Sequence, residues 1–132
     1  MFEFTHISAS INRSAKDVYG FISDGDNLEL WATGLGITFE RDSEQWRVHG
    51  PLGTVRVRLA GRNDFGVADQ IVTLESGVTV HNPIRVIPNG TGSTVTFTLM
   101  RPAGVSDEQF NDDAKWIEKD LAALKTLLEM PH

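Results

Sequence analysis

The chain has 132 residues and no cysteine, and its 12 Lys and Arg against 18 Asp and Glu give a net charge of −6. An acidic surface repels phosphate backbones and anionic membranes. No apolar run approaches the roughly 18 residues of a membrane span. The lack of cysteine excludes disulfides and thiolate sites. We therefore expect one cytoplasmic domain over residues 1–132, with no nucleic-acid partner and no membrane insertion.

The first expected element is a strand over residues 2–11, because its side chains alternate between two faces. Neither face is fully polar, so the pattern does not by itself decide which face is buried. We assign the face that carries Phe4, His6 and Ser8 to the interior.

Two short helices are expected after this strand. Ser14 stands three residues before Asp17, which is the spacing of a capping box at a helix start. An acidic turn ends this helix, and a second helix carrying Trp31 follows, with Asp26 or Asn27 as its cap.

Six further strands are predicted in the middle of the chain, separated by tight turns. The clearest pattern puts Val57 and its apolar neighbours on one face and Arg56 and Arg58 on the other. With the first strand, the set makes a seven-stranded antiparallel meander. The six strands cover residues 36–40, 45–49, 54–59, 70–75, 78–87 and 94–99.

A long amphipathic helix is predicted at the C-terminus, with Ser106 as its cap. A helix of about 23 residues is roughly 35 Å long, so it must lie across several strands. We assign Lys119 and Asp120 to its polar face. Its apolar residues recur at steps of three and four and share one face: Phe110, Ala114, Ile117, Leu121, Leu124 and Leu128.

Two segments carry a resemblance to a known family. Residues 10–24, SINRSAKDVYGFISD, and residues 116–125, WIEKDLAALK, resemble the opening and closing elements of the SRPBCC superfamily, which includes START lipid-transfer domains, polyketide cyclases and birch-pollen-allergen-type proteins. The resemblance implies an α+β helix-grip fold, in which a curved seven-stranded antiparallel sheet wraps around the long C-terminal helix and two short helices follow the first strand. It also implies a cavity between the sheet and that helix.

Such a cavity must hold a ligand or water. An empty void of about 300 Å³ would cost about 7 kcal/mol, which rivals the whole stability of a typical domain. The inward polar residues are expected to be His6, Ser8, Gln70 and Asn82. The residues expected to bind a ligand are Phe4, His6, Trp31, Phe39, Trp46, Val57, Asn82, Phe97, Phe110, Ile117 and Leu121.

Two of these residues have alternative interpretations. His6 could act as an acid or base near neutral pH, or it could simply be hydrogen-bonded within its strand. Asn82 precedes Pro83, so it either aims its amide into the cavity or sits at a kink. The four histidines have no metal-ligand spacing, and no cofactor motif is present, so neither a metal nor a cofactor is expected.

Three functions remain open from the sequence. The first is binding or transport of a small hydrophobic molecule, such as a polyketide, lipid or isoprenoid-like compound. The second is an enzyme of the cyclase, dehydratase or isomerase type, for which the catalytic residues are unknown. The third is a non-catalytic interaction or stress-response protein. The sequence does not decide whether the chain forms a homodimer.

Overall fold

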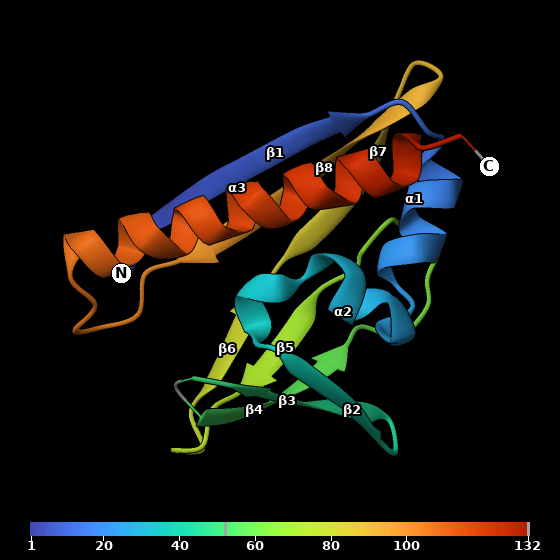
Figure 1. Cartoon of the computed structure of the whole chain (residues 1–132). Coiled ribbons are helices and arrows are strands. Elements are labelled where there is room, and N and C mark those ends of the chain that lie inside the picture. The colour runs from blue at the N-terminus through green and yellow to red at the C-terminus, as the bar shows by residue number, and fades with distance from the viewer. Residues whose placement is uncertain (52, 132) are drawn as a thin grey trace.

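The computed structural model describes residues 1–51 and 53–131, and in these residues the chain forms eight strands, three α-helices and two 3₁₀ turns (Figure 1). The strands are β1 Phe4–Ile11, β2 Thr38–Asp42, β3 Gln45–Gly50, β4 Gly53–Leu59, β5 Gln70–Thr73, β6 Thr79–Asn82, β7 Ile84–Asn89 and β8 Gly92–Met100. The helices are α1 Ala15–Ile22, α2 Leu28–Trp31 and α3 Asp107–Glu129, and the 3₁₀ turns are η1 Gly25–Asn27 and η2 Thr33–Leu35.

The strands form two antiparallel sheets with the orders β1-β8-β7 and β2-β3-β4-β5-β6. β6 runs directly into β7 through Pro83, so the two sheets make one bent layer (Figure 1). Seven strands were expected over the described residues and eight are found, because Pro83 has no N–H and divides the expected strand 78–87 in two. The carbonyl of Pro83 still accepts a hydrogen bond from the backbone of Thr98, which ties the bend to β8.

Side-chain caps start two of the three helices. Ser14 Oγ accepts a hydrogen bond from the backbone N–H of Asp17, and Ser106 Oγ accepts one from the backbone N–H of Gln109, as the sequence predicted. The second short helix is found as α2, with Asn27 at its N-cap position as expected, but the Asn27 side chain makes no capping hydrogen bond. The side chain of Asp24 caps the preceding η1 instead.

The core lies between the bent layer and α3. The buried residues of α3 include Phe110, Leu121, Leu124 and Leu128, which confirms the predicted apolar stripe. Figure 1 shows α3 running along β1 and β8, with α2 between α3 and the lower strands. Val57 is fully buried while Arg56 and Arg58 are exposed, as predicted for β4.

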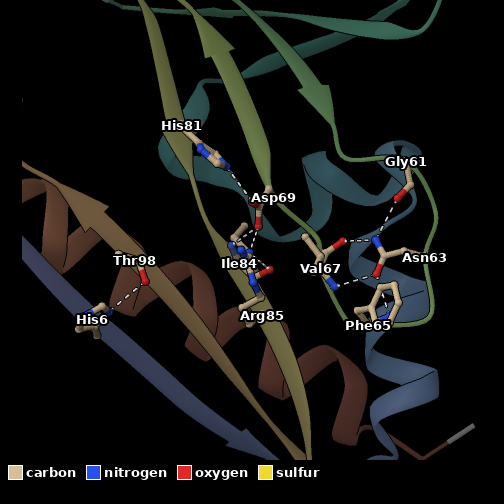
Figure 2. A network of polar contacts seen from close by, with 10 residues as sticks. All are labelled: His6, Gly61, Asn63, Phe65, Val67, Asp69, His81, Ile84, Arg85 and Thr98. Carbon is tan, nitrogen blue, oxygen red and sulfur yellow. Dashed lines mark hydrogen bonds and ion pairs between the residues drawn. The ribbon is translucent and has the colours of Figure 1, made fainter.

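The outer face of β1 carries the residues that the sequence analysis placed inside. In β1 the inward positions are Ile7, Ala9 and Ile11, whereas Phe4 is 50% exposed. His6 Nδ1 instead lies 2.9 Å from Thr98 Oγ1 on the outer surface (Figure 2). The inward orientation predicted for Phe4, His6 and Ser8 is therefore wrong. The two faces of this strand are similarly apolar, and an error of one residue in the register exchanges the inner face with the outer face.

The loop between β4 and β5 is organised by one asparagine. Asn63 Oδ1 accepts hydrogen bonds from the backbone of Phe65 and Val67, and its Nδ2 donates to the carbonyls of Gly61 and Val67 (Figure 2). Its own backbone N–H donates to the hydroxyl of Tyr19. This loop therefore packs on α1 in a fixed shape and pairs with β7.

Gly66 is required where this loop meets β7. It has a φ of 70°, and a Cβ at this position would overlap the carbonyl oxygen of Val86. Replacement of Gly66 by alanine is expected to lower the free energy of unfolding by about 2 kcal/mol or more, because a left-handed backbone and a backbone clash coincide. Urea denaturation would measure this. Gly77→Ala is the control for strain alone, since its φ is 89° and its Cβ would meet nothing within 4 Å.

Candidate functional site

A pocket of about 170 Å³ lies between the bent layer, η2 and α3. α2 and η2 contribute one wall, the strands β5, β6 and β8 a second, and α3 the third. The lining residues are Trp31, Ala32, Gly34, Leu35, Gln70, Asn82, Phe97, Leu99, Asp113, Trp116, Ile117, Asp120 and Leu121.

Two amide side chains stand next to each other on the strand wall. Gln70 of β5 and Asn82 of β6 are directly paired across the ladder, so their side chains lie on the same face. Gln70 is only 2% exposed. Within residues 1–51 and 53–131, no hydrogen bond joins either side-chain amide to another residue, and neither amide is among the fully enclosed unpaired groups. Both residues line the pocket, so these two amides are available to a molecule in it.

Trp31, on the opposite wall, contains an unpaired polar group that is fully enclosed. Its ring is 2% exposed, and its Nε1 has no partner among the described residues. A buried indole N–H usually finds an acceptor. The pocket therefore combines an apolar lining with several hydrogen-bonding groups that the protein itself leaves unused, a pattern typical of small-molecule sites.

Asp120 places a carboxylate in the α3 wall. Its Oδ1 accepts a hydrogen bond of 2.7 Å from Thr33 Oγ1, and its Oδ2 accepts one of 3.0 Å from the backbone N–H of Gly34. Burial raises the pKa of Asp120, and the hydrogen bonds from Thr33 and Gly34 only partly oppose this effect. A Cβ at Gly34 would lie 3.0 Å from Asp120 Oδ2, so a larger residue here would press on the carboxylate.

Apolar side chains form the rest of the lining. Phe97 and Leu99 project inward from β8, and Ile117 and Leu121 face them from α3. Trp116 is 47% exposed and belongs to both the pocket and the surface, so it marks the mouth. Lys119 Nζ lies 4.6 Å from the centre of the Trp116 ring.

The structure brings five of the eleven expected ligand-binding residues to this pocket. They are Trp31, Asn82, Phe97, Ile117 and Leu121. Asn82 sits at the kink beside Pro83 and is also one of the residues that line the pocket.

The other six expected residues lie elsewhere. Phe4 and His6 are on the outer face, while Val57 and Phe110 are packed in the core. Phe39 and Trp46 line a separate hollow at the surface with Gly25 and Arg41. A Cβ at Gly25 would overlap the Trp46 ring, so that ring is packed on η1 and is not free to turn toward the pocket.

The sequence analysis missed the two carboxylates of the pocket. Asp120 was assigned to the polar face of α3, but it is 7% exposed. The spacing of Asp113, Ile117, Asp120 and Leu124 by steps of four, three and four places them along one line of the helix. An acidic residue on such a line beside apolar neighbours is the signal that could have identified Asp120.

A second polar cluster lies where the two sheets separate (Figure 2). Asp69 accepts hydrogen bonds from the backbone N–H of Ile84 at 2.9 Å, from His81 Nε2 at 2.7 Å, and from the guanidinium of Arg85. Burial by itself would raise the pKa of Asp69, but these three partners together lower it below the ordinary aspartate value. The cluster joins the start of β5 to β6 and β7 across the break at Pro83, so we assign it a structural role.

No metal site or membrane span is seen in the described part of the chain. Residues 1–51 and 53–131 contain no group of three or more His, Asp or Glu side chains placed to hold a metal ion. No helix in the same residues is both long and apolar enough to cross a membrane. His132, one of the four histidines considered as ligands, lies outside the described residues.

Comparison with known proteins identifies the fold. No protein-family model and no curated protein sequence matches the chain. Among solved structures, an uncharacterised protein from Bacillus thuringiensis is similar with a TM-score of 0.75 at 20% identity, covering 96% of this chain and 98% of that one. The Aha1 dimer from Colwellia psychrerythraea has a TM-score of 0.73 at 16% identity, with 97% of each chain covered.

A third solved structure shows the same arrangement. Ara h 8.0201 is similar with a TM-score of 0.65 at 9% identity, covering 97% of this chain and 98% of that one. Identities this low establish the fold alone. The eight antiparallel strands of the described residues, the two short helices after β1 and the long α3 match this architecture, so the chain has a helix-grip fold.

Proposed function

We propose that the protein binds a compact, largely apolar small molecule in the pocket between its β-layer and α3, as a member of the SRPBCC superfamily. The observation that carries this proposal is Gln70, a side chain only 2% exposed that lines the pocket beside Asn82. No described residue hydrogen-bonds its amide, and the amide is not fully enclosed, unlike the unpaired Trp31 Nε1 and Ser93 Oγ. A ligand that bonds to Gln70 or Asn82 gains hydrogen bonds worth about 0.5–1.5 kcal/mol each.

The volume limits the size of the ligand. A cavity of about 150 Å³ holds one benzene molecule, and this pocket measures about 170 Å³. A single ring with a short substituent therefore fits, whereas a long acyl chain does not. A ligand of this size is expected to bind with a Kd of about 0.1–1 mM, given the free energy available to each non-hydrogen atom.

The binding test uses a panel that spans these sizes. Indole, tyrosol, 2,4-dihydroxyacetophenone, geraniol and 1-decanol would be titrated by isothermal titration calorimetry, and native mass spectrometry of the purified protein would detect a ligand that is already bound. We expect binding by the compact aromatic compounds and none by the uncharged long chain of 1-decanol. Absence of binding by every member of the panel would contradict the proposal.

Gln70 gives a prediction in which stability and binding change in opposite directions. Replacement of Gln70 by leucine removes an amide that no described residue hydrogen-bonds in a side chain only 2% exposed, and keeps the side-chain volume similar. It is expected to raise the free energy of unfolding by about 1 kcal/mol and to weaken ligand binding at least tenfold. Chemical denaturation and calorimetry measure the two effects. A variant that loses stability and keeps its affinity would show that Gln70 has only a structural role.

An enzyme acting on the same pocket is the second candidate. The observation in its favour is the pair of adjacent amides, since Gln70 and Asn82 can both donate to one carbonyl oxygen and stabilise the negative charge that forms on it. His6 has no part in such a reaction, because it lies on the outer face. Asn82→Leu should then abolish turnover of a carbonyl substrate while His6→Ala leaves turnover unchanged. The reverse result would exclude this candidate.

A further inference from the structure

The ionisable residues of the pocket are all acidic. Among the lining residues that the structure describes, Asp113 and Asp120 are the ones that ionise, and no Lys, Arg or His is with them. The chain as a whole also carries a net charge of −6. An anionic ligand would be repelled both at the pocket and on approach, whereas a cation would be attracted.

Asp120 retains the capacity to accept a further hydrogen bond. A carboxylate has about four acceptor sites. The Thr33 hydroxyl uses one site on Oδ1 and the N–H of Gly34 uses one on Oδ2, and the backbone N–H of Thr33 also interacts with the carboxylate, so about one acceptor site stays free. A buried carboxylate with no cation at hydrogen-bond distance is costly to ionise. An ammonium group, with three donors and no acceptor, complements this free site.

Unpaired polar groups on two other walls point independently to a ligand. Gln70 and Trp31 are each 2% exposed and line the pocket. Trp31 Nε1 is buried without a partner in the described residues, and no described residue hydrogen-bonds the Gln70 amide. Asn82 adds a second amide beside Gln70. A ligand that meets Asp120 with a cation therefore also meets hydrogen-bonding groups across the pocket, which favours a molecule with polar groups at both ends.

Aromatic walls suit a cationic ligand that contains a ring. Trp31, Phe97 and Trp116 line the pocket. Aromatic faces stabilise ammonium groups when both are shielded from water. Lys119 already places its ammonium over the Trp116 ring at the mouth. A single ring with a two-carbon amine fills a volume near 170 Å³ and can contact these walls.

We propose that the pocket binds a single-ring arylalkylamine in its protonated form, with the ammonium group paired to Asp120 and a ring hydroxyl or carbonyl bonded to Gln70 or Asn82. This inference rests on the proposed function, because it names the chemical class of the ligand for the same pocket.

Three isosteric probes test the charge preference. Tyramine carries an ammonium where tyrosol carries a hydroxyl, and 4-hydroxyphenylacetate carries a carboxylate. Calorimetry on the full chain at pH 7 should give about a tenfold or greater preference for tyramine over tyrosol, as expected for one hydrogen bond between charged groups. The carboxylate should bind most weakly. Asp120→Asn should bring tyramine to the affinity of tyrosol, and the matched control Asp112→Asn, exposed on the same helix, should keep the preference.

The pH dependence of the unaltered protein gives a readout that does not depend on a variant folding. Tyramine stays protonated throughout acid pH, so its affinity should fall as the pH drops through the pKa of Asp120, which burial raises, while the affinity of tyrosol should not. Asp113 and Lys119 are the other charges near Asp120, since Thr33 and Gly34 of η2 and the two amides do not ionise. Asp113→Asn should keep this pH dependence.

The outcomes separate this inference from the proposed function. Equal affinities for tyramine and tyrosol, or a preference that survives Asp120→Asn in a folded variant, would overturn the amine inference and leave the binding pocket intact. Binding by other panel compounds but by none of the three probes would have the same consequence. Absence of binding by every compound would overturn both.

Discussion

Replacement of Asp69 by alanine is expected to lower the free energy of unfolding by about 2–3 kcal/mol and the melting temperature by about 10 °C. The main reason is the backbone N–H of Ile84, a fully buried residue, which loses its acceptor. His81 and Arg85 are half-exposed, so water can replace the hydrogen bonds that they lose with Asp69. Their contribution to the loss of stability is therefore smaller. Differential scanning calorimetry would measure the change.

Variants of the neighbouring residues provide the controls. Asp64→Ala, an exposed aspartate in the preceding loop, should change stability by no more than about 0.5 kcal/mol. His81→Ala and Arg85→Ala should each cost less than Asp69→Ala. If Asp69→Ala were as harmless as Asp64→Ala, the cluster would not hold the two sheets together at Pro83.

The same cluster is expected to make stability depend on acid pH. Because the pKa of Asp69 is lower in the folded state, its contribution is fully present above the unfolded-state value of about 3.9 and is lost as the pH falls through the folded value. Asp120 acts in the opposite direction, since its raised pKa means that lowering the pH relieves the cost of its burial. Comparing the unaltered protein with Asp69→Asn from pH 7 to pH 2 isolates Asp69. The stability difference should shrink below about pH 3.9, and a constant difference would refute the assignment.

Filling the pocket gives the largest expected effect on binding. Leu99 lines the pocket from β8, and Leu99→Trp would extend an indole into the space that a ligand needs. The affinity for the best compound of the panel should fall by about a hundredfold or more, equivalent to about 2.7 kcal/mol. The stability should change little, because the filled void offsets part of the strain.

Met100→Trp is the matched control for this variant. Met100 is the next residue of β8, and its side chain lies on the outer face opposite Phe4. The same enlargement there should leave the affinity unchanged. Equal affinities of Leu99→Trp and the unaltered protein would mean that the ligand binds elsewhere.

The parts of the fold that were predictable from the sequence are those with a single unambiguous period. The apolar stripe of α3 and the alternation around Val57 each have one polar and one apolar face, so burial follows directly. β1 has no such polar and apolar faces, because Phe4 and His6 lie on one face and Ile7 and Ile11 lie on the other. Only the pairing with β8 decides which face is covered.

The pocket was predictable in outline but not in its chemistry. Ile117 and Leu121 follow from the helix pattern, and Asn82 follows from its position before Pro83. Asp120 does not, because its burial results from η2 folding over α3 so that Thr33 and Gly34 reach its carboxylate. These two contacts link Asp120 to residues that lie 87 and 86 positions earlier in the sequence, and no local pattern encodes a contact over that separation.

The most direct test of the account is a two-dimensional ¹H–¹⁵N NMR titration with tyramine and with tyrosol. We expect the largest shifts at the side-chain amides of Gln70 and Asn82, the indole N–H of Trp31 and the backbone N–H of Gly34, all of which border the pocket. Shifts confined to the outer face around His6, or no shifts at millimolar concentrations of either compound, would contradict a binding site between the β-layer and α3.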